Sequence, residues 1–511
     1  MYIQPETNIR ILRNVPLDTT YEHTIYFGSK TAQYSYFAGL TKYNLTNYTY
    51  QRVKRGICRV GIKPDNLYDC NYMMFQNKAY GDKWFYAYIT SVEFVNNECA
   101  EISFELDVIQ TWFFDCEPDY CFVEREHSVT DKIGENIVPE NVDCGEYVYN
   151  GYGKITQSLD NLCVIIVIGD LDEAPEGTVY DGVFGGCSLY AYNMSDTEAI
   201  RAKLDTYSGK PDSIVSMYMS PTIGVGTIPT GGTKITRANS AEILHIESEA
   251  ITSDDTLDGY MPRNLKMYTY PYNFLSVETS KQSNIFRYEF FSELKPTFDV
   301  SIPITQPVQV ALRAKNYKGS GDNTLNSYTL VLDEYPMCSW NTDAFKAWLA
   351  QNALPLQTAG GGLIAGLALG VTGIALPGLA IAGGAAKALS LLNQGYKASV
   401  SSDIIKGSTS SGNIDVANGT KTFYGGRCSV NSQYAKMIDD YFTMFGYATK
   451  TIKKPNRNSR PHWNYVKTVG ATITGSVPAD DMRKICEIYD AGITFWKNGS
   501  EVGRYDLDNS V

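Results

Sequence analysis

The chain has 511 residues and a formal net charge of −12, so a surface that holds nucleic acid is not expected, because a negative wall repels a DNA duplex. The length indicates more than one domain, and the 38 tyrosines favour strands over long helices. The eleven cysteines include no CxxC pair, which indicates reduced, mostly buried thiols made in a cytoplasm. The N-terminus has no basic segment followed by an apolar core, so we expect no signal peptide.

Residues 1–150 have the pattern of a β-rich domain. Short strand-like runs occur at residues 24–27, 58–62 and 72–77, separated by turn residues. In residues 100–112 the apolar side chains of Ile102, Phe104, Leu106 and Val108 alternate with polar ones. This period of two predicts a half-buried strand. Its solvated face would carry Glu101, Ser103, Glu105 and Asp107.

The middle of the chain, residues 151–349, also has the pattern of strands. Residues 162–168 are continuously apolar, which predicts a core strand covered on both faces. Residues 222–229 lack the third glycine of a dinucleotide-binding fingerprint and are interpreted as strand and turn. Residues 268–272 and 329–332 are further predicted strands.

A long apolar insert follows, with no charged residue between Ala347 and Ala386. As a helix, residues 359–376 would span about 27 Å at 1.5 Å per residue, against a hydrocarbon core of about 30 Å. The dipeptide Pro377-Gly378 ends a helix and reverses the chain, and a second apolar arm covers residues 379–392. The pattern predicts a hairpin of two short apolar helices.

Small residues recur every four positions in this insert. Gly362, Gly366 and Gly370 would form one smooth stripe on a helix, and small residues at that spacing let helices approach closely in lipid. Nine Leu, Ile or Val residues lie between Leu363 and Ile381, which together contribute only about −3 to −5 kcal/mol to insertion. One copy would therefore insert marginally, whereas several copies delivered together could insert decisively.

We predict that this segment is a membrane-active loop that is exposed conditionally. A buried helical hairpin is an alternative, but each glycine costs about 0.8–1.0 kcal/mol relative to alanine in a helix. A conventional membrane anchor is another, but the segment is interrupted and its flanks lack Lys/Arg clusters. The predicted membrane-inserting residues are Gly362, Leu363, Ile364, Gly366, Leu367, Leu369, Gly370, Val371, Ile374, Leu376, Pro377, Gly378, Leu379 and Ile381.

The C-terminal part combines a predicted tether with two predicted helices. Residues 399–412 are rich in Ser and Gly, which predicts a flexible tether that would let the hairpin move away from the body. Residues 434–447 and 480–489 place apolar side chains at helical spacing and predict short amphipathic helices.

No catalytic, cofactor-binding or metal-binding site is predicted. The histidines are His23, His127, His245 and His462, and none lies in a recognisable catalytic or zinc motif. Carboxylates such as Asp107, Glu124 and Glu126 could form a glycosidase pair in principle, but nothing in the sequence brings two of them together.

A basic cluster with aromatic neighbours interrupts the acidic chain. We interpret it as a solvated loop because of Pro455 and Pro461, with a subunit contact as a second possibility and DNA binding as a third. The cluster comprises Lys450, Lys453, Lys454, Arg457 and Arg460.

Several motifs resemble one known family. They are residues 74–87, 104–115 and 123–127 and, near the C-terminus, residues 445–447, 453–456, 464–466 and 490–496. These runs are similar to the distal tail knob (tail tube) protein of small, short-tailed Picovirinae-type phages that infect Gram-positive bacteria. The order of parts also matches, since a β-rich part precedes a long Gly/Ala-rich insert and a closing segment. The middle of the chain is diverged.

The resemblance implies a mainly β, multi-domain subunit with β-sandwich or barrel-like parts that forms a tube, with the apolar loop and a few short C-terminal helices. Residues 1–150 would form the tube body, completed by residues 422–511. Residues 151–349 would be the middle part and residues 350–421 the membrane-active loop with its tether.

The function implied by the resemblance is that of a non-enzymatic virion protein at the distal tail tip. It would form a homo-hexameric tube that conducts double-stranded DNA without sequence-specific binding. Hydrophobic loops would plug the tube, leave it and form a pore in the host cell membrane for genome ejection. Its partners would include other tail proteins, such as a lower collar or tail connector, and no cofactor is expected.

The sequence is also compatible with two other classes of protein. An envelope-degrading tail enzyme would degrade cell wall in a release assay with the purified protein. A secreted pore-forming toxin would share the amphiphilic loop, but it would normally carry the export signal that this sequence is expected to lack.

Overall fold

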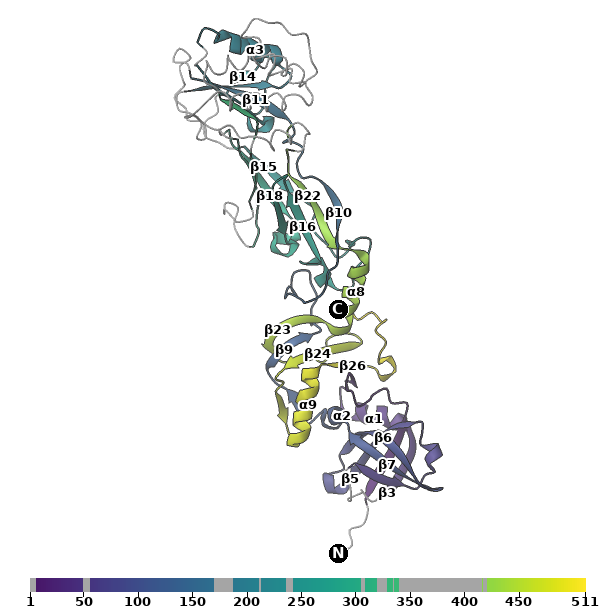
Figure 1. The fold of residues 1–511 in the computed structure, drawn as a ribbon. Helices are drawn as coiled ribbons and strands as arrows, with labels where there is room; N and C mark the ends of the chain where they lie inside the picture. The colour runs from purple at the N-terminus through teal and green to yellow at the C-terminus, as the bar shows by residue number, and fades with distance from the viewer. Residues whose placement is uncertain are drawn as a thin grey trace, which may run out of the picture. The chain divides into compact units, whose positions relative to one another are not determined.

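The computed structural model describes residues 6–48, 56–169, 187–210, 213–235, 242–304, 308–318, 329–333, 335–339, 416 and 421–511. These residues are mainly β, with several separate sheets and few helices (Figure 1). The predicted mainly β fold class is therefore confirmed.

The chain divides into two compact units, each built from more than one stretch of sequence. Unit 1 comprises Met1–Gly145, Gly259–Met267 and Asn431–Val511, and unit 2 comprises Glu146–Asp258 and Tyr268–Val430. The C-terminal segment thus folds with the N-terminal one.

The first sheet of unit 1 has six antiparallel strands. In spatial order they are β3 (Thr41–Tyr48), β1 (Thr7–Arg13), β5 (Cys70–Asn77), β6 (Trp84–Asn96), β7 (Cys99–Leu106) and β4 (Ile57–Val60). Helix α1 (Lys30–Gly39) is capped by Ser29, whose side chain accepts a hydrogen bond from the Ala32 amide. It buries Phe37 against the sheet, where the ring stacks on Tyr72 with centroids 5.2 Å apart.

The second sheet of unit 1 has five strands, with helices packed against it. The strands are β2 (His23–Ile25), β26 (Ile493–Trp496), β24 (Trp463–Val469), β9 (Cys121–Glu126) and β23 (Tyr447–Lys453), and only β2 and β26 pair in parallel. Helix α9 (Ala479–Ala491) packs against β24. Helix α8 (Ser432–Phe445) ends at Gly446, which has φ 65°, and a Cβ there would lie 2.2 Å from the Glu126 carbonyl oxygen. A two-stranded pair, β8 (Cys116–Pro118) and β25 (Ile473–Gly475), completes the strands of unit 1 in the described part of the chain.

In its described residues, unit 2 has three antiparallel sheets and helix α3 (Thr197–Thr206). The first comprises β10 (Tyr147–Lys154), β22 (Tyr424–Val430), β16 (Asn273–Glu278) and β17 (Ser283–Phe286). The second comprises β14 (Thr233–Lys234), β12 (Ser188–Asn193), β11 (Leu162–Ile168), β13 (Ile214–Pro221) and β21 (Met337–Ser339). The third comprises β15 (Glu242–Glu247), β18 (Thr297–Ile302), β19 (Val310–Ala314) and β20 (Leu330–Leu332).

The strand predicted over residues 100–112 ends earlier than its alternation suggests. Strand β7 stops at Leu106, and helix α2 (Val108–Trp112) follows. Asp107 was predicted to lie on a solvated face, but it is 1% exposed and caps α2 by accepting a hydrogen bond from the Gln110 amide at 3.0 Å. An Asp side chain just before a helix accepts a hydrogen bond from an amide of the first turn that would otherwise be unpaired. This local bond starts the helix although the apolar residues still alternate with a period of two.

The strand predicted over residues 268–272 is wrong, and the prediction of strand and turn for residues 222–229 is right only for the turn. Residues 222–224 form a 3-10 turn after β13, and residues 265–268 form another before β16 begins at Asn273. The predictions for residues 162–168 and 329–332 are confirmed by β11, whose last six residues are buried, and by β20. The two amphipathic helices are confirmed as α8 and α9, whereas α1 and α3 were not predicted.

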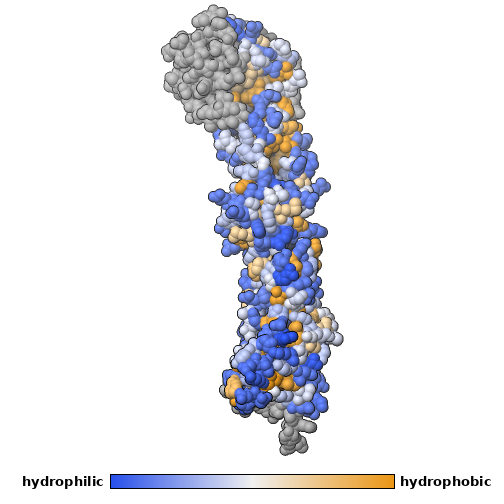
Figure 2. Space-filling view, turned by 90° about the vertical axis from the view of Figure 1, so that its right-hand side faces the viewer, coloured by the Kyte–Doolittle hydropathy of each residue, from blue (hydrophilic) through white to orange (hydrophobic). Residues whose placement is uncertain are grey.

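The described cysteines are less buried than predicted, since only half of them are buried. Ten are free, of which Cys58, Cys70, Cys121, Cys163 and Cys428 are buried. Burial raises the pKa of the Cys70 thiol to about 11, so this group is a weak nucleophile at neutral pH. On the surface, hydrophobic residues form small patches among hydrophilic ones (Figure 2).

Candidate functional site

The predicted membrane-inserting residues, from Gly362 to Ile381, lie outside the described residues, as does the predicted tether at 399–412. The structure does describe the chain on both sides of the insert. We call residues 335–339 and 421–430 the insert root, and both parts belong to unit 2.

The chain leaves unit 2 from an edge strand. Strand β21 pairs antiparallel with β13, which places Met337 opposite Tyr218 and Ser339 opposite Ser216. Just before β21, the Pro336 carbonyl accepts a hydrogen bond from the amide of the buried Met219 at 2.9 Å. Because β13 is itself paired with the buried strand β11, the departure point is fixed to the core of this sheet.

The chain returns through a strand inside another sheet. Phe423 is fully buried, and its carbonyl accepts a hydrogen bond from the Ile155 amide at 2.9 Å. The Thr422 hydroxyl donates to the Thr156 carbonyl at 2.9 Å. Strand β22 then runs between β10 and β16, and a Cβ at Gly425 would lie 2.7 Å from the Ile155 side chain. This end of the insert is therefore held by backbone pairing on both sides.

The two ends of the insert root meet through a pair of buried side chains. The Lys421 ammonium lies 5.3 Å from the centroid of the Tyr335 ring, and the residues are 4% and 2% exposed. A desolvated cation over an aromatic face is a favourable contact, worth about 2 kcal/mol. The described chain on the two sides of the insert is thus in contact at this pair.

The basic cluster does not form a continuous solvated surface. Lys453 pairs with the buried carboxylate of Glu126, and Arg460 is only 2% exposed and donates from Nε to the Ser128 carbonyl at 3.0 Å. The Arg457 guanidinium lies 5.7 Å from the Phe113 ring centroid. The solvated-loop interpretation is therefore wrong for Arg460, which is buried and holds the loop against Ser128, whereas the Lys453 side chain is still 38% exposed at the end of β23.

The carboxylates that could have formed a glycosidase pair each have a structural role. Glu124 pairs with Lys467 at 3.0 Å, Glu126 accepts a hydrogen bond from the Asn456 amide at 2.8 Å, and Asp107 caps α2. Within the described ranges, no group of three or more His, Cys, Asp or Glu side chains could hold a metal ion.

His127 is the one histidine of the four that is deeply buried. Its Nδ1 accepts a hydrogen bond from the Tyr465 amide at 2.8 Å, so its Nε2, 3.0 Å from the Thr443 carbonyl, carries the proton and donates. Burial, with Arg460 and Arg125 nearby, lowers the pKa of His127 to about 3. The imidazole is therefore a neutral structural linker between β24 and α8.

Comparison with known proteins assigns the chain to a family. The family model described as "Bacillus phage phi29, Tail knob protein gp9, C-terminal domain" matches residues 235–510, which is more than half of the 511-residue chain. The chain belongs to the tail knob protein gp9 family. The N-terminal region also matches the model described as "Caudoviral major tail protein N-terminus", over residues 5–117.

Tail knob proteins align with this chain over almost its whole length. Those of Bacillus phages PZA and B103 are 25% and 26% identical to it, over 99% of this chain and 98% of each relative. The solved tail knob protein gp12 of bacteriophage C1 has a TM-score of 0.60 at 15% identity, covering 97% of this chain and 98% of that one. The structural likeness shows a shared fold.

Sequence reasoning missed the root pair of this tail knob protein. Tyr335 and Lys421 are far apart in the chain, and nothing in their local sequence marks them as neighbours. The sequence offers no signal for the pair, because the Ser/Gly-rich residues 399–412 separate the apolar insert from Lys421. None of the helices in the described part of the chain combines the length and apolar character needed to span a bilayer.

Proposed function

We propose that this tail knob protein assembles as a homo-hexamer into a tube at the distal tip of a short phage tail. Double-stranded DNA passes through the lumen without sequence-specific contacts. The apolar inserts, one from each copy, plug the tube and leave it on contact with the host. They then enter the host cell membrane together and form a pore for genome ejection.

The insert root is the observation that carries the proposal. Because Tyr335 and Lys421 are in contact and both ends are paired to sheets, the insert can change place without unravelling a strand. Insertion of several copies together would be more favourable than insertion of one. Insertion of one segment is marginal at about −3 to −5 kcal/mol, and tethered copies act at high effective concentration.

Each stretch of the chain is proposed to form one part of the assembly. Residues 1–150 and 422–511 form the tube body, residues 151–349 the middle part, and residues 350–421 the loop with its tether. The grouping of Met1–Gly145 with Asn431–Val511 in one compact unit supports the first assignment. The net charge of −12 supports a conduit rather than a DNA-binding surface.

The assembly acts without catalysis and meets other tail proteins, such as a lower collar or tail connector. It is made in the bacterial cytoplasm, is carried in the virion and reaches the host membrane only on ejection. The structural engagement of Asp107, Glu124 and Glu126 supports a non-enzymatic role.

Leakage of dye-loaded liposomes tests the pore. Deletion of residues 354–392 is expected to abolish leakage. The oligomer should stay intact in sedimentation, because the deletion lies between the two parts of the insert root and leaves both unchanged. Gly366→Leu is expected to reduce leakage about tenfold by spoiling close helix contact. Ala368→Leu introduces the same side chain off the predicted stripe and should leave leakage near the wild-type level.

Two outcomes would count against the proposal. Leakage that survives the deletion would remove the insert from pore formation. Equal effects of Gly366→Leu and Ala368→Leu would remove the glycine stripe from the mechanism, because bulk alone would then explain both.

A further inference from the structure

The five-stranded sheet of unit 1 has one face covered along most of its length. Val466 of β24 and Ile493 of β26 are fully buried in the same cluster as Ile485 of α9. At the end of α9, Asp490 accepts a hydrogen bond from the Thr468 hydroxyl at 2.7 Å. Helix α9 therefore covers the face that carries Val466 and Thr468.

The opposite face is covered by α8 at one end only. The Arg125 guanidinium lies 4.7 Å from the Tyr441 ring, and the Tyr465 ring lies 5.1 Å from that of Phe445. The Trp463 indole also donates to the Thr443 carbonyl at 3.1 Å. These contacts reach along β24 only as far as the middle of the strand.

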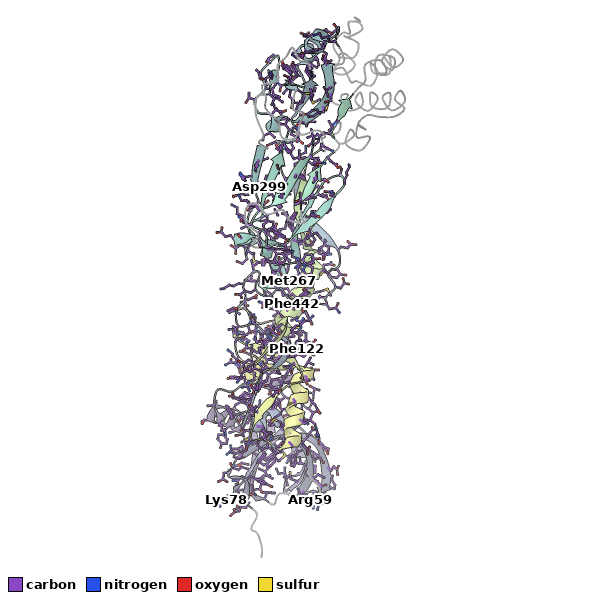
Figure 3. All side chains as sticks on the ribbon, turned by 90° about the vertical axis from the view of Figure 1, so that its left-hand side faces the viewer. Arg59, Lys78, Phe122, Met267, Asp299 and Phe442 are labelled. Carbon is purple, nitrogen blue, oxygen red and sulfur yellow. The ribbon has the colours of Figure 1, made fainter. Side chains whose placement is uncertain are left out.

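The other end of this face carries three large apolar side chains in register. Ile452 of β23 pairs with Phe122 of β9, and Phe122 pairs with Val469 of β24. Their exposed fractions are 73%, 39% and 56% (Phe122 is labelled in Figure 3). Directly opposed residues have Cβ atoms about 4.5–5.5 Å apart, so these three form a continuous apolar row.

Isolated apolar residues on a surface are ordinary, but a contiguous apolar row marks an interaction site. Its charged surroundings are mainly basic. Lys450 is exposed, Lys454 lies 3.9 Å from Asp119, and Lys467 pairs with Glu124. Among these five residues the three cations exceed the two carboxylates by one positive charge.

Unit 1 also has exposed apolar residues in acidic surroundings. At the turn end of the β6–β7 hairpin, Phe94 is 66% exposed and Val95 is 39% exposed. Glu93 and Glu98 are exposed on either side of them in the sequence. Glu101 lies on the same hairpin and pairs with Arg59 at 2.6 Å, so this end carries an excess of negative charge.

We propose that the apolar row is the docking site for the β6–β7 hairpin of a second copy of this chain. Phe94 and Val95 cover Ile452, Phe122 and Val469, while the glutamates of the hairpin face the lysines around the row. The two surfaces are different parts of one chain, so the contact is heterologous, and a heterologous contact closes into a ring when its rotation permits. This inference rests on the self-assembly in the proposed function and names the surfaces that carry it.

Ile452→Glu tests the row with little risk to folding, because the side chain is 73% exposed. It places a carboxylate opposite the acidic hairpin, and we expect the association constant from analytical ultracentrifugation of the full chain to fall at least about tenfold. Ile243→Glu is the matched control, since Ile243 is also a strand residue and is 51% exposed, but lies in unit 2. An unchanged oligomer for Ile452→Glu would overturn the inference.

A charge exchange tests the hairpin as the partner. Lys450→Glu with Lys454→Glu, and separately Glu93→Lys with Glu98→Lys, should each weaken association. The chain carrying all four changes should recover most of the loss, because the charges are then exchanged across the contact. If association of the chain with all four changes does not recover, the hairpin is excluded as the partner of the apolar row. A wild-type chain that is monomeric at all concentrations would instead overturn the proposed self-assembly itself.

Discussion

Neutral His127 makes unit 1 sensitive to acid. Both ring nitrogens are used, and protonation of Nδ1 would break the bond from the Tyr465 amide and bury a cation near Arg460. The pKa is about 3 in the folded chain against an ordinary value of 6.5. Between these values the unfolded chain binds one more proton, so the free energy of unfolding falls as the pH is lowered from 6.5 towards 3.

We expect His127 to contribute a loss of about 2.5 kcal/mol between pH 7 and pH 4.5. His127→Gln removes the titration and should flatten this part of the pH profile, even if it lowers stability at pH 7. Denaturant unfolding at the two pH values measures the difference. A variant with the same pH dependence as the wild type would show that other groups cause the acid sensitivity.

At the scale of elements, Asp107 decides where β7 becomes α2. Its Oδ1 caps the helix, and its Oδ2 accepts a hydrogen bond from the buried Tyr72 hydroxyl at 2.8 Å. Burial raises the pKa of the Asp107 carboxyl despite these bonds. The carboxyl is therefore buried at a desolvation cost, which is offset because it satisfies two buried donors.

Asp107→Ala is expected to lower the free energy of unfolding by about 2–4 kcal/mol, from the lost cap and the unpaired Tyr72 hydroxyl. Asp107→Asn keeps one acceptor oxygen for the Gln110 amide, and its Nδ2 group can donate to the Tyr72 hydroxyl oxygen, so it should cost clearly less. Chemical denaturation with circular dichroism compares the variants. Equal losses for the two would mean that the charge, rather than the acceptor geometry, is what matters.

Local patterns predicted some elements and missed others for identifiable reasons. The apolar run of β11 and the helical spacing in α8 and α9 reflect side chains that face a core, so periodicity was sufficient. The turn at residues 222–224 has β-like composition, but its shape comes from the Pro221 boundary with β13. The contact between Tyr335 and Lys421 depends on strand pairing across distant sequence, which no local pattern encodes. The membrane-inserting residues remain a prediction.

At the scale of the whole molecule, the two units have separate cores. Phe298 of β18 is fully buried among aromatic rings of unit 2, 5.1 Å from Phe286. Tyr72 and Phe37 are at the centre of a cluster in unit 1. Units with their own cores generally unfold as separate cooperative steps.

Calorimetry is therefore expected to show more than one transition. Phe298→Ala should lower the free energy of unfolding of unit 2 by about 3–5 kcal/mol and so shift one transition to lower temperature. His127→Gln should move the other. A single transition shifted by both substitutions would show that the units unfold as one.

The path of the backbone has a mechanical consequence. The chain passes between the units at four places, namely Gly145–Glu146, Asp258–Gly259, Met267–Tyr268 and Val430–Asn431. A tensile load applied across the units is shared by these four covalent connections in parallel. Proteolytic cleavage at one of them would leave the remaining three to transmit the force.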